Sequence, residues 1–512
     1  MQDQGPVAAF LADPATHGGI APERIDTHAA MVFLAGDRAY KLKRAVWFPF
    51  LDFSTLEKRH AACDAEVRLN RRTAPELYLG CRAVTRLGDG SLALDGAGEP
   101  VEWLVVMRRF DQDLLFDRMA ERGALEPRHM VELADEIAAF HAGAERRPDL
   151  GGSAALRWII EDDVAELAAL PEAFGTAGIE TLRHLSEESL GRQAPLLDAR
   201  REAGFVRHCH GDLHLRNIFL WEGRPTLFDC LEFDESLACT DVLYDLAFLL
   251  MDLEHRGRRD FANLILNRYL QRTGDYDGLP AISLFLSCRA AIRAKVEASG
   301  ATYQRDPTNA EGMRAMAREY LKLATEFLIP HSPRLLAIGG ESGSGKSTVA
   351  GLVAPGLGNA PGAMIVRSDV TRKHLAGCPL EDPLAQEAYR REMTERTYAE
   401  VARRAKAGLE AGLTVIADAV YADPAERDAI EAVARDAGVP FHGFWLHAPL
   451  DLRIARVAGR RSDASDATQE FLMRHPRRER GRMTWSRIDA SGSPGSVADS
   501  MRTVLDVAAT AA

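Results

Sequence analysis

The chain has 512 residues, more than a single hydrophobic core usually serves, so at least two domains are expected. A net charge of -12 and a pI near 5.7 argue against nucleic-acid binding, because neutralising phosphates requires a concentrated basic face. The seven cysteines lack CxxC spacing and therefore suit neither a disulfide framework nor a zinc site.

Two sequence features bear on location. The N-terminus lacks the basic start and long apolar run of a signal peptide. The most apolar run, residues 245–253, is too short to cross a membrane and contains two aspartates. We therefore expect a cytoplasmic protein with no membrane partner.

The first elements predict a small mixed lobe. Residues 31–44 form two apolar segments around a Gly-Asp turn, which indicates a hairpin. A helix is expected over residues 54–72, beginning with a capping box of Ser54 and Glu57 and ending before Pro75. A turn-rich segment and an apolar strand at 102–110 follow.

Helical periodicity then dominates from residue 126 to 328, with one interruption of strands and polar loops at 205–233. This order indicates a two-lobed, protein-kinase-like α+β domain. Two prolines at 330 and 333 mark the expected boundary between domains at 1–330 and 334–512. Beyond it, apolar strands alternate with helices, which predicts an α/β P-loop NTPase fold with a parallel sheet.

Residues 340–347 read GESGSGKS and match G-x-x-x-x-G-K-[ST] between an apolar strand and a helix. In this motif, backbone N–H groups and the helix N-terminus surround phosphates. Lys346 is expected to reach the β- and γ-phosphates, Ser347 to bind Mg²⁺, and Thr348 to contact the α-phosphate. The predicted nucleotide-binding residues here are Gly340, Glu341, Ser342, Gly343, Ser344, Gly345, Lys346, Ser347 and Thr348.

Further polar residues follow the P-loop. Asp418 ends an apolar strand, as a Mg²⁺-binding Walker B carboxylate does. Asp369 follows another strand and either faces the acceptor hydroxyl as a catalytic residue or caps a helix. Arg456 and Arg460 lie on a segment that is either a lid over the phosphates or a solvated helix. This region resembles the zeta-toxin-like and gluconate-kinase-like P-loop kinases.

The string HCHGDLHLRNIF places Asn217 five residues after Asp212, and Asp229 follows at the end of an apolar segment. Phosphoryl transfer needs a carboxylate that deprotonates the attacking hydroxyl and a metal-binding amide nearby. The motif resembles HGDxHxxN of the aminoglycoside and choline phosphotransferase family. The resemblance implies Asp212 as catalytic base and Asn217 with Asp229 as Mg²⁺ ligands. Asp245 either buttresses this loop or lies on the surface of an amphipathic core helix.

Upstream, Lys41 on the hairpin and Glu66 on the following helix match the pair that directs a kinase lysine toward the α- and β-phosphates. Lys43 lies two residues further on and shares the strand face of Lys41. Of the two, we prefer Lys41 as the lysine that binds the phosphates. The first hairpin lacks the G-x-G-x-x-G loop of protein kinases, and this favours an aminoglycoside-type enzyme.

The order of the two halves resembles bifunctional aminoglycoside phosphotransferase/ATP-binding proteins. This implies ATP and Mg²⁺ in each half and transfer of the γ-phosphoryl group to a hydroxyl of a small-molecule acceptor: a sugar, an aminoglycoside-like compound or a sugar acid. Carboxylates at 233–241 would suit a cationic acceptor. Alternatively, the P-loop half is a nucleotide-sensing regulator without an acceptor, or the first half only binds. The sequence does not indicate an oligomeric state.

Overall fold

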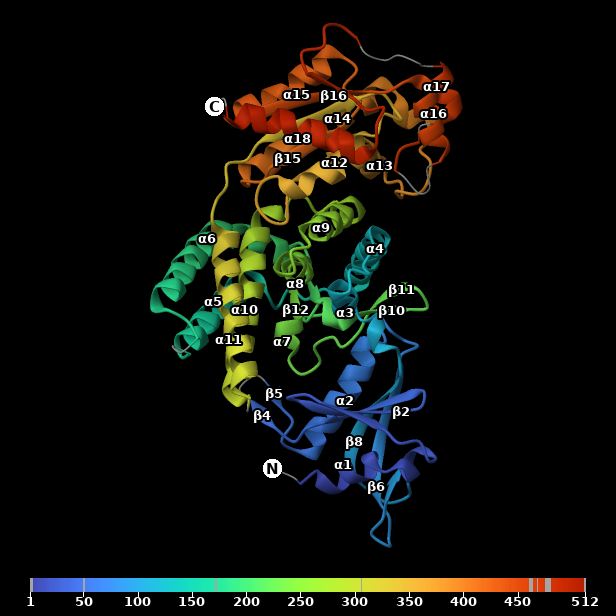
Figure 1. Cartoon of the computed structure of the whole chain (residues 1–512), viewed down its shortest axis with the longest axis vertical. Coiled ribbons are helices and arrows are strands. Elements are labelled where there is room, and N and C mark those ends of the chain that lie inside the picture. The colour runs from blue at the N-terminus through green and yellow to red at the C-terminus, as the bar shows by residue number, and fades with distance from the viewer. Residues whose placement is uncertain are drawn as a thin grey trace. The chain divides into compact units, whose positions relative to one another are not determined.

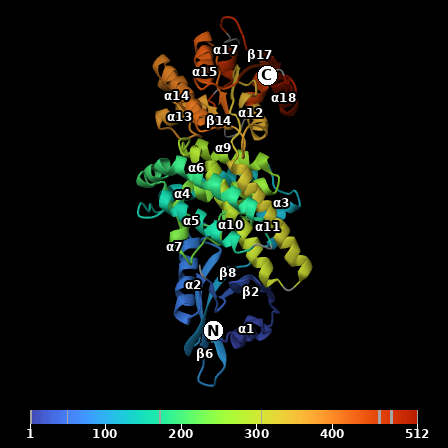
Figure 2. The ribbon, with the colours of Figure 1, turned by 90° about the vertical axis from the view of Figure 1, so that its left-hand side faces the viewer.

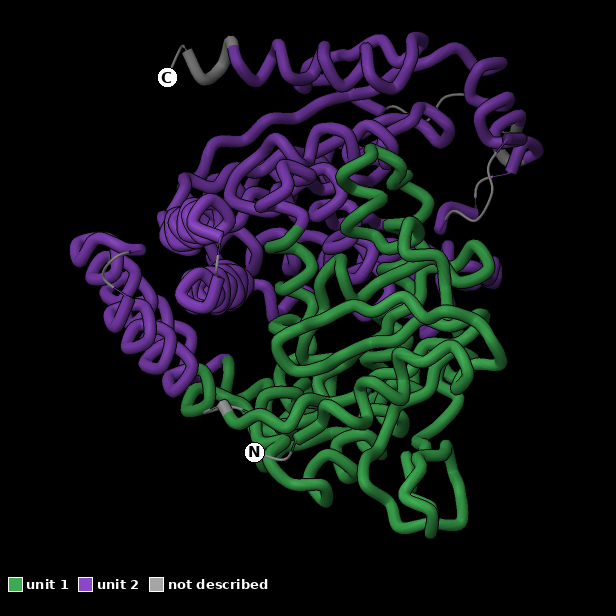
Figure 3. The backbone as a smooth tube through the Cα atoms, turned by 60° about the horizontal axis from the view of Figure 1, so that its bottom comes forward, with its two compact units in different colours: residues 1–156, 197–252 green, residues 157–196, 253–512 purple. Residues whose placement is uncertain are grey.

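The computed structural model describes residues 3–48, 51–170, 173–304, 306–459, 464–466, 468–474 and 480–510. It divides into two compact units, Met1–Leu156 with Leu197–Asp252, and Arg157–Leu196 with Leu253–Ala512 (Figure 3). The boundaries of these units differ from those of the domains expected at 1–330 and 334–512. The two expected domains therefore stay a prediction. None of the described helices is long and apolar enough to cross a membrane.

The described helices run in chain order (Figure 1). They are α1 Gly5–Ala12, α2 Leu56–Asn70, α3 Phe116–Glu121, α4 Pro127–Gly143, α5 Gly152–Ala168, α6 Thr176–Glu202, α7 Glu235–Ala238, α8 Val242–His255, α9 Arg259–Thr273, α10 Ile282–Tyr303, α11 Pro307–Leu328, α12 Lys346–Val353, α13 Ser368–Ala376, α14 Arg391–Glu410, α15 Pro424–Asp436, α16 Leu450–Ala458, α17 Gln469–Arg474 and α18 Pro494–Thr510.

The described strands form two larger sheets and several short pairs. They are β1 Glu23–Asp26, β2 Ala30–Ala35, β3 Arg38–Lys43, β4 Trp47–Phe48, β5 Leu51–Asp52, β6 Tyr78–Arg86, β7 Leu92–Leu94, β8 Glu99–Arg108, β9 Val206–His208, β10 Ile218–Trp221, β11 Arg224–Leu227, β12 Cys239–Asp241, β13 Leu335–Gly340, β14 Met364–Arg367, β15 Val415–Asp418, β16 Phe441–His447 and β17 Ser486–Asp489.

In the first unit, a six-stranded antiparallel sheet has the order β1-β2-β3-β8-β6-β7. Side chains alternate between its two faces. On β8, Leu104 and Val106 pack in the cluster that includes Leu11 of α1, whereas Val105 packs with Val67 of α2. The predicted hairpin is confirmed as β2 and β3. Alternation along β3 directs Lys41 and Lys43 to the α2 face, because Leu42 between them belongs to the opposite cluster.

The helix predicted over residues 54–72 is α2, but its capping box was wrong. The N-cap is Thr55, whose hydroxyl accepts a hydrogen bond from the Lys58 N–H. The Ser54 hydroxyl instead donates to Asp52. The helix therefore begins one residue later than a Ser54 cap would place it.

The second unit contains a five-stranded sheet of order β14-β15-β13-β16-β17, in which all neighbouring strands are parallel. This confirms the predicted α/β fold. Figure 2 shows α14 on one side of the sheet and α12 with α18 on the other. Val349 and Val353 of α12 and Met501 of α18 pack on sheet residues in one buried cluster. The P-loop lies between β13 and α12, at the carboxyl edge of the sheet, where open α/β folds bind ligands.

Helix α9 makes buried polar contacts with β14 and with Ala363, the residue before it, inside this second unit. The Asn263 and Asn267 side-chain amides donate to the Ala363 carbonyl at 3.1 and 3.2 Å. The Asn267 Oδ1 accepts from the Ile365 N–H at 2.7 Å. Both asparagines are almost fully buried. Because β14 is the edge strand of the sheet, these amides replace the neighbouring strand that its outer backbone groups lack.

Candidate active sites

The predicted catalytic loop connects β9 to β10 and brings Asp212 and Asn217 together. The Asn217 Nδ2 donates to the Asp212 carboxylate at 2.8 Å and to the Asp212 carbonyl at 2.9 Å. The His214 Nε2 lies 3.3 Å from the same carboxylate. The Asp212 side chain is 41 % exposed, so an acceptor can reach it. Since the amide nitrogen faces Asp212, the amide oxygen is the atom that would bind a cation.

Asp245 and Asp252 of α8 accept hydrogen bonds from backbone N–H groups of this loop. Asp245 accepts from the Gly211 N–H at 2.8 Å and the His210 N–H at 3.2 Å, and Asp252 accepts from the Leu215 N–H at 3.0 Å. Both carboxylates are buried, so the alternative of a surface aspartate at 245 was wrong. Their acceptor role also explains why an apolar helix carries two charges.

A network of five charged side chains joins α2 and β3 to the segment after β11. The Lys41 Nζ lies 2.9 Å from Glu66 Oε1 and 2.7 Å from Asp229 Oδ1. The Lys43 Nζ lies 2.6 Å from Glu66 Oε2 and also pairs with Glu232. The predicted Lys41–Glu66 pair is therefore present, and Glu66 is shared by both lysines.

The charges in this network shift one another's pKa. Burial alone would raise the pKa of Glu66, but the two ammonium groups outweigh it and lower the pKa to about 2. Burial raises the pKa of Glu232, which the Lys43 charge only partly offsets. Lys41 and Lys43 keep their protons, because the neighbouring carboxylates outweigh burial and raise their pKa values. Near neutral pH, Glu66 is therefore ionised and both lysines that pair with it are protonated.

Asp229 is held in an unusual backbone conformation beside Lys41. Its φ is 57°, a left-handed value that few residues other than glycine adopt. Its N–H donates to the Tyr78 hydroxyl of β6 at 3.1 Å, and the next N–H, of Cys230, donates to Asn70 of α2. The small lobe therefore sets the direction of the Asp229 carboxylate. Asn217 and Asp229 offer the hard oxygen ligands that Mg²⁺ prefers.

Replacing Glu66 with glutamine is expected to lower the free energy of unfolding by about 3–5 kcal/mol at pH 7, because it leaves the buried Lys43 and the partly buried Lys41 undercompensated. The folded pKa of Glu66 lies below its ordinary value of 4.5, so its stabilisation is present above that value and is lost as pH falls toward 2. Urea unfolding at pH 7 and pH 3 should show a smaller difference between variant and wild type at the lower pH. Glu57→Gln, on an exposed turn of α2, is the control, and an equal loss in both variants would contradict the expectation.

The P-loop has the backbone conformation that its glycines were expected to supply. Gly340, Gly343 and Gly345 have φ of 139°, 82° and 94°. A Cβ on Gly343 would lie 2.8 Å from the Arg453 carbonyl oxygen, so no side chain fits there. The Lys346 Nζ donates to the Glu341 carbonyl at 3.1 Å, across the loop.

Ser347 and Asp418 meet at the end of the sheet. The Ser347 hydroxyl donates to Asp418 Oδ2 at 2.6 Å, and Arg367 Nε lies 3.6 Å from the same oxygen. Burial raises the pKa of Asp418, while the positive charges of Arg367 and Lys346 oppose this rise. A hydroxyl and a buried carboxylate in contact are a suitable ligand pair for Mg²⁺, whose charge would compensate the buried Asp418. Thr348 is exposed at the third position of α12.

The arginines of α16 contact the P-loop. Arg456 donates to the Ser344 carbonyl at 3.3 Å and to the Gly492 carbonyl at 3.1 Å. Arg453 is buried and pairs with Glu341 at 3.1 Å. The alternative of a purely solvated helix was therefore wrong for these two residues. Arg460 lies outside the described residues.

Asp369 lies in the first turn of α13, directly after β14. The N-cap of this helix is Arg367, so the alternative of Asp369 as the cap was wrong. Nearby, Arg372 donates to the Ala388 carbonyl at 2.8 Å, and the Tyr389 hydroxyl donates to Asp466 at 2.7 Å. Burial is the main cause of the raised pKa of both Asp418 and Tyr389, and the negative charge of Asp369 adds to it.

The carboxylates at 233–241 cap a helix or pair with arginines. Asp234 caps α7 through the Ser236 N–H, and Glu235 pairs with Arg147. Asp241 forms a bidentate pair with Arg200 at 2.7 and 2.9 Å. These three carboxylates therefore do not form the acidic acceptor surface that the sequence suggested.

Sequence reasoning missed three contributors: Glu232, Tyr78 and the pairing of Arg453 with Glu341. Glu232 follows Asp229 by three residues and has no spacing signal of its own. Tyr78 reads as an ordinary strand aromatic. For Arg453, the i,i+3 spacing from Arg456 was a usable signal, because it places both on one face of α16.

Comparison with known proteins matches both halves to families. The family described as "Phosphotransferase enzyme family" matches residues 50–282, and the family described as "AAA domain" matches residues 335–479. Among solved structures, a choline/ethanolamine kinase family protein from Mesorhizobium loti is 14 % identical, with TM-score 0.38, covering 62 % of this chain and 98 % of its own. A sugar kinase from Janibacter sp. HTCC2649 is 22 % identical, with TM-score 0.26, covering 34 % of this chain and 96 % of its own.

Full-length relatives occur in mycobacteria. An uncharacterized protein of Mycobacterium tuberculosis and one of Mycobacterium bovis are each 33 % identical over 477 residues, covering 91 % of this chain and 92 % of their own length. The phosphotransferase and AAA matches lie in the order that the sequence predicted. The chain therefore belongs, with these mycobacterial proteins, to the bifunctional aminoglycoside phosphotransferase/ATP-binding family and is a kinase-type enzyme.

Proposed function

We propose that the chain has two ATP–Mg²⁺ sites, one in each half, and transfers the γ-phosphoryl group to a hydroxyl of a sugar, aminoglycoside-like or sugar-acid acceptor. The observation that carries the proposal is that two contact groups meet. Asn217 lies 2.8 Å from the Asp212 carboxylate, and Lys41 lies 2.9 Å from Glu66 and 2.7 Å from Asp229. The Asn217 amide links the groups, 3.5 Å from the Asp229 carbonyl. Phosphoryl transfer depends on positioning and electrostatics, and this arrangement provides both.

In the N-terminal site, Asp212 accepts the proton of the acceptor hydroxyl as its oxygen bonds to the γ-phosphorus. The bond from this phosphorus to the bridging oxygen breaks, and ADP leaves. Lys41, oriented by Glu66, binds the α- and β-phosphates. Asn217 and Asp229 would hold Mg²⁺, which would neutralise charge on the phosphates.

In the P-loop site, the amides of residues 340–348 and Lys346 bind the phosphates, and Ser347 with Asp418 would hold Mg²⁺. Asp369 follows β14, the strand that pairs with β15 and its terminal Asp418. In this site Asp369 accepts the proton of the acceptor hydroxyl. Arg456 already contacts the P-loop backbone at Ser344, so α16 is placed to bring its guanidinium toward the transferring phosphate. Arg460 is assigned the same role from the sequence.

The test is ADP release by purified protein over a panel of aminoglycosides, sugars, sugar acids and nucleosides. Wild type is compared with the double variant Asp212→Asn/Lys346→Ala, which lacks one essential group in each site. An acceptor that stimulates wild type and leaves the double variant at background supports the proposal. Equal turnover in both proteins would refute it.

A second candidate function makes the P-loop half a nucleotide-sensing regulator with no acceptor of its own. The contacts of Asn263 and Asn267 with β14 favour it, because α9 belongs to the stretch matched to the phosphotransferase family and β14 leads into α13 with Asp369. Along the chain, α9 also directly follows α8, which anchors the catalytic loop.

This regulatory function predicts a coupling that a double-mutant cycle detects. Lys346→Ala is expected to change acceptor-dependent turnover at the N-terminal site in wild type. In an Asn267→Ala background, where the contact to Ile365 is removed, the same change should have little further effect. Asn309→Ala, at an exposed position on α11, is the matched control. Unchanged N-terminal turnover in every Lys346→Ala protein would contradict regulation.

A further inference from the structure

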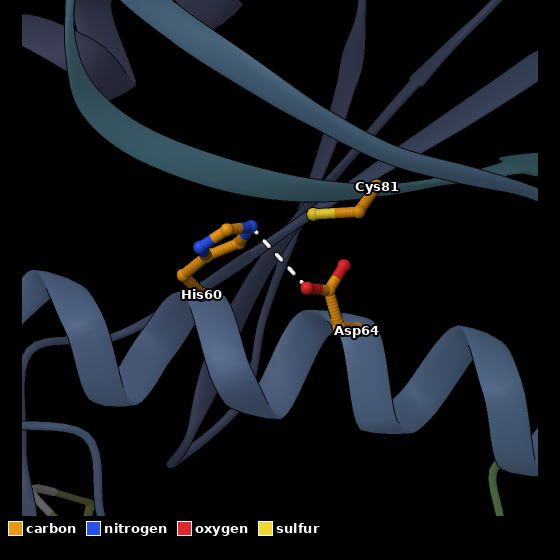
Figure 4. A group of neighbouring side chains, drawn as sticks. All are labelled: His60, Asp64 and Cys81. Carbon is orange, nitrogen blue, oxygen red and sulfur yellow. Dashed lines mark ion pairs between the residues drawn. The ribbon is translucent and has the colours of Figure 1, made fainter.

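Three potential metal ligands meet between α2 and β6. His60 and Asp64 lie one turn apart on α2, and Cys81 lies on the facing strand β6 (Figure 4). One ligand atom from each side chain lies within 4.8 Å of the others. Figure 4 shows the three side chains pointing toward one common point.

One ligand separation matches that of a tetrahedral centre, and the two separations to Cys81 are no more than 4.8 Å. The His60 Nε2 and Asp64 Oδ2 are 3.3 Å apart. Zinc bonds of about 2.0 Å to nitrogen and oxygen and about 2.3 Å to sulfur place tetrahedral ligand atoms roughly 3.3–3.7 Å from each other. The Asp64 side chain is 60 % exposed, so it can rotate toward an ion without disturbing the core.

The surroundings favour a cation here. The His60 ring stacks on Trp103, with ring centroids 3.5 Å apart and planes tilted by 10°, so its direction is set before any ion arrives. Within the described part of the chain, no lysine or arginine forms an ion pair with Asp64. The group of His208, Glu235 and Cys239 differs in this respect, because Arg147 contacts both Glu235 and Cys239 there.

We propose that His60, Asp64 and Cys81 bind a borderline divalent ion of the Zn²⁺ class, with water as the fourth ligand. The mixed nitrogen, oxygen and sulfur set selects such an ion over Mg²⁺ and Ca²⁺, which prefer oxygen alone. The Cys81 thiol loses its proton on binding. No spacing rule predicts the site, because its ligands come from a helix and a strand rather than from a CxxC motif.

The ion would join α2 to the sheet near the kinase-like network. Glu66, which both lysines share, follows Asp64 by two residues on the same helix. An ion that binds only the folded lobe stabilises it by mass action. Metal is therefore expected to raise the unfolding temperature of the lobe that contains α2.

The experiment uses the full chain with Co²⁺ as a spectroscopic probe, in excess Mg²⁺ that occupies oxygen-only sites. Thiolate bound to Co²⁺ gives a charge-transfer band in the near ultraviolet, which oxygen sites lack. We expect one equivalent of Co²⁺ to produce this band and Zn²⁺ to abolish it by displacement. Cys81→Ser should remove the band, and His60→Gln should weaken binding at least about tenfold.

Cys378→Ser is the matched control, because Cys378 is also a half-buried cysteine but has no histidine or carboxylate ligand group in the described residues. It should keep the band and the affinity. A band that persists in Cys81→Ser, or no band in wild type, would overturn the site. Circular dichroism of each variant without metal separates lost binding from lost folding, and neither outcome depends on phosphotransfer.

Discussion

Replacing Asp212 with asparagine is expected to lower kcat for phosphoryl transfer at the N-terminal site by about 10²–10⁴-fold, the usual contribution of a general base. The amide has nearly the shape of the carboxylate but cannot accept the hydroxyl proton. Asn217 donates to the Asp212 carbonyl as well as its carboxylate, so the loop retains one of the two contacts. ATP affinity at this site should change little, because Lys41, Asn217 and Asp229 are unaltered.

The measurement is acceptor-dependent ADP release in a Lys346→Ala background, which leaves only the N-terminal site active. Binding of a fluorescent ATP analogue in the same background reports affinity separately. Asp37→Asn, in the exposed turn between β2 and β3, controls for loss of a carboxylate. Full turnover by Asp212→Asn would exclude Asp212 as the base.

Replacing Lys346 with alanine is expected to reduce ATP turnover at the P-loop by about 10²–10³-fold, the cost typical of removing one group that stabilises transition-state charge. In the structure this lysine lies across the loop on the Glu341 carbonyl, and its loss removes a positive charge from the loop and from the neighbourhood of Asp418. The backbone amides remain, and weak nucleotide binding should survive.

This effect is measured as ADP release in the Asp212→Asn background. Lys406→Ala is the control, since Lys406 is an exposed lysine on α14. Binding of nucleotide should become weaker and less dependent on Mg²⁺ in Lys346→Ala only. If Lys346→Ala and Lys406→Ala turn over ATP equally, the P-loop site does not hydrolyse ATP.

Local patterns predicted the elements well because each pattern depends on neighbours in the chain. The parallel sheet around the P-loop and the β2–β3 hairpin follow from short-range periodicity and turn residues, and the structure contains both. The pairing of Lys41 with Glu66 was also predictable, since strand alternation and helix spacing limit which residues face each other. The roles assigned to these residues stay predictions until the variants are measured.

Contacts between distant segments were not predictable in the same way. Lys43 and Lys41 share one strand face, and only the three-dimensional path of the segment after β11 gives Lys43 its own partner, Glu232. The α8 aspartates gave a related difficulty, because a charge in an apolar helix reads as a surface residue until the backbone amides that bind it are known. The predicted N-cap of α2 was wrong by one residue, because the Ser54 hydroxyl donates to Asp52 instead and Thr55 caps the helix.

The asparagines of α9 also limit how the chain can be divided. A fragment that starts at residue 334 would contain β14 without Asn263 and Asn267, and the Ala363 carbonyl and Ile365 N–H would lose these partners. An uncovered edge strand of a sheet is a template for pairing with other copies. The P-loop half expressed by itself is therefore expected to self-associate, and a fragment that begins before α9 is the better choice for isolating it.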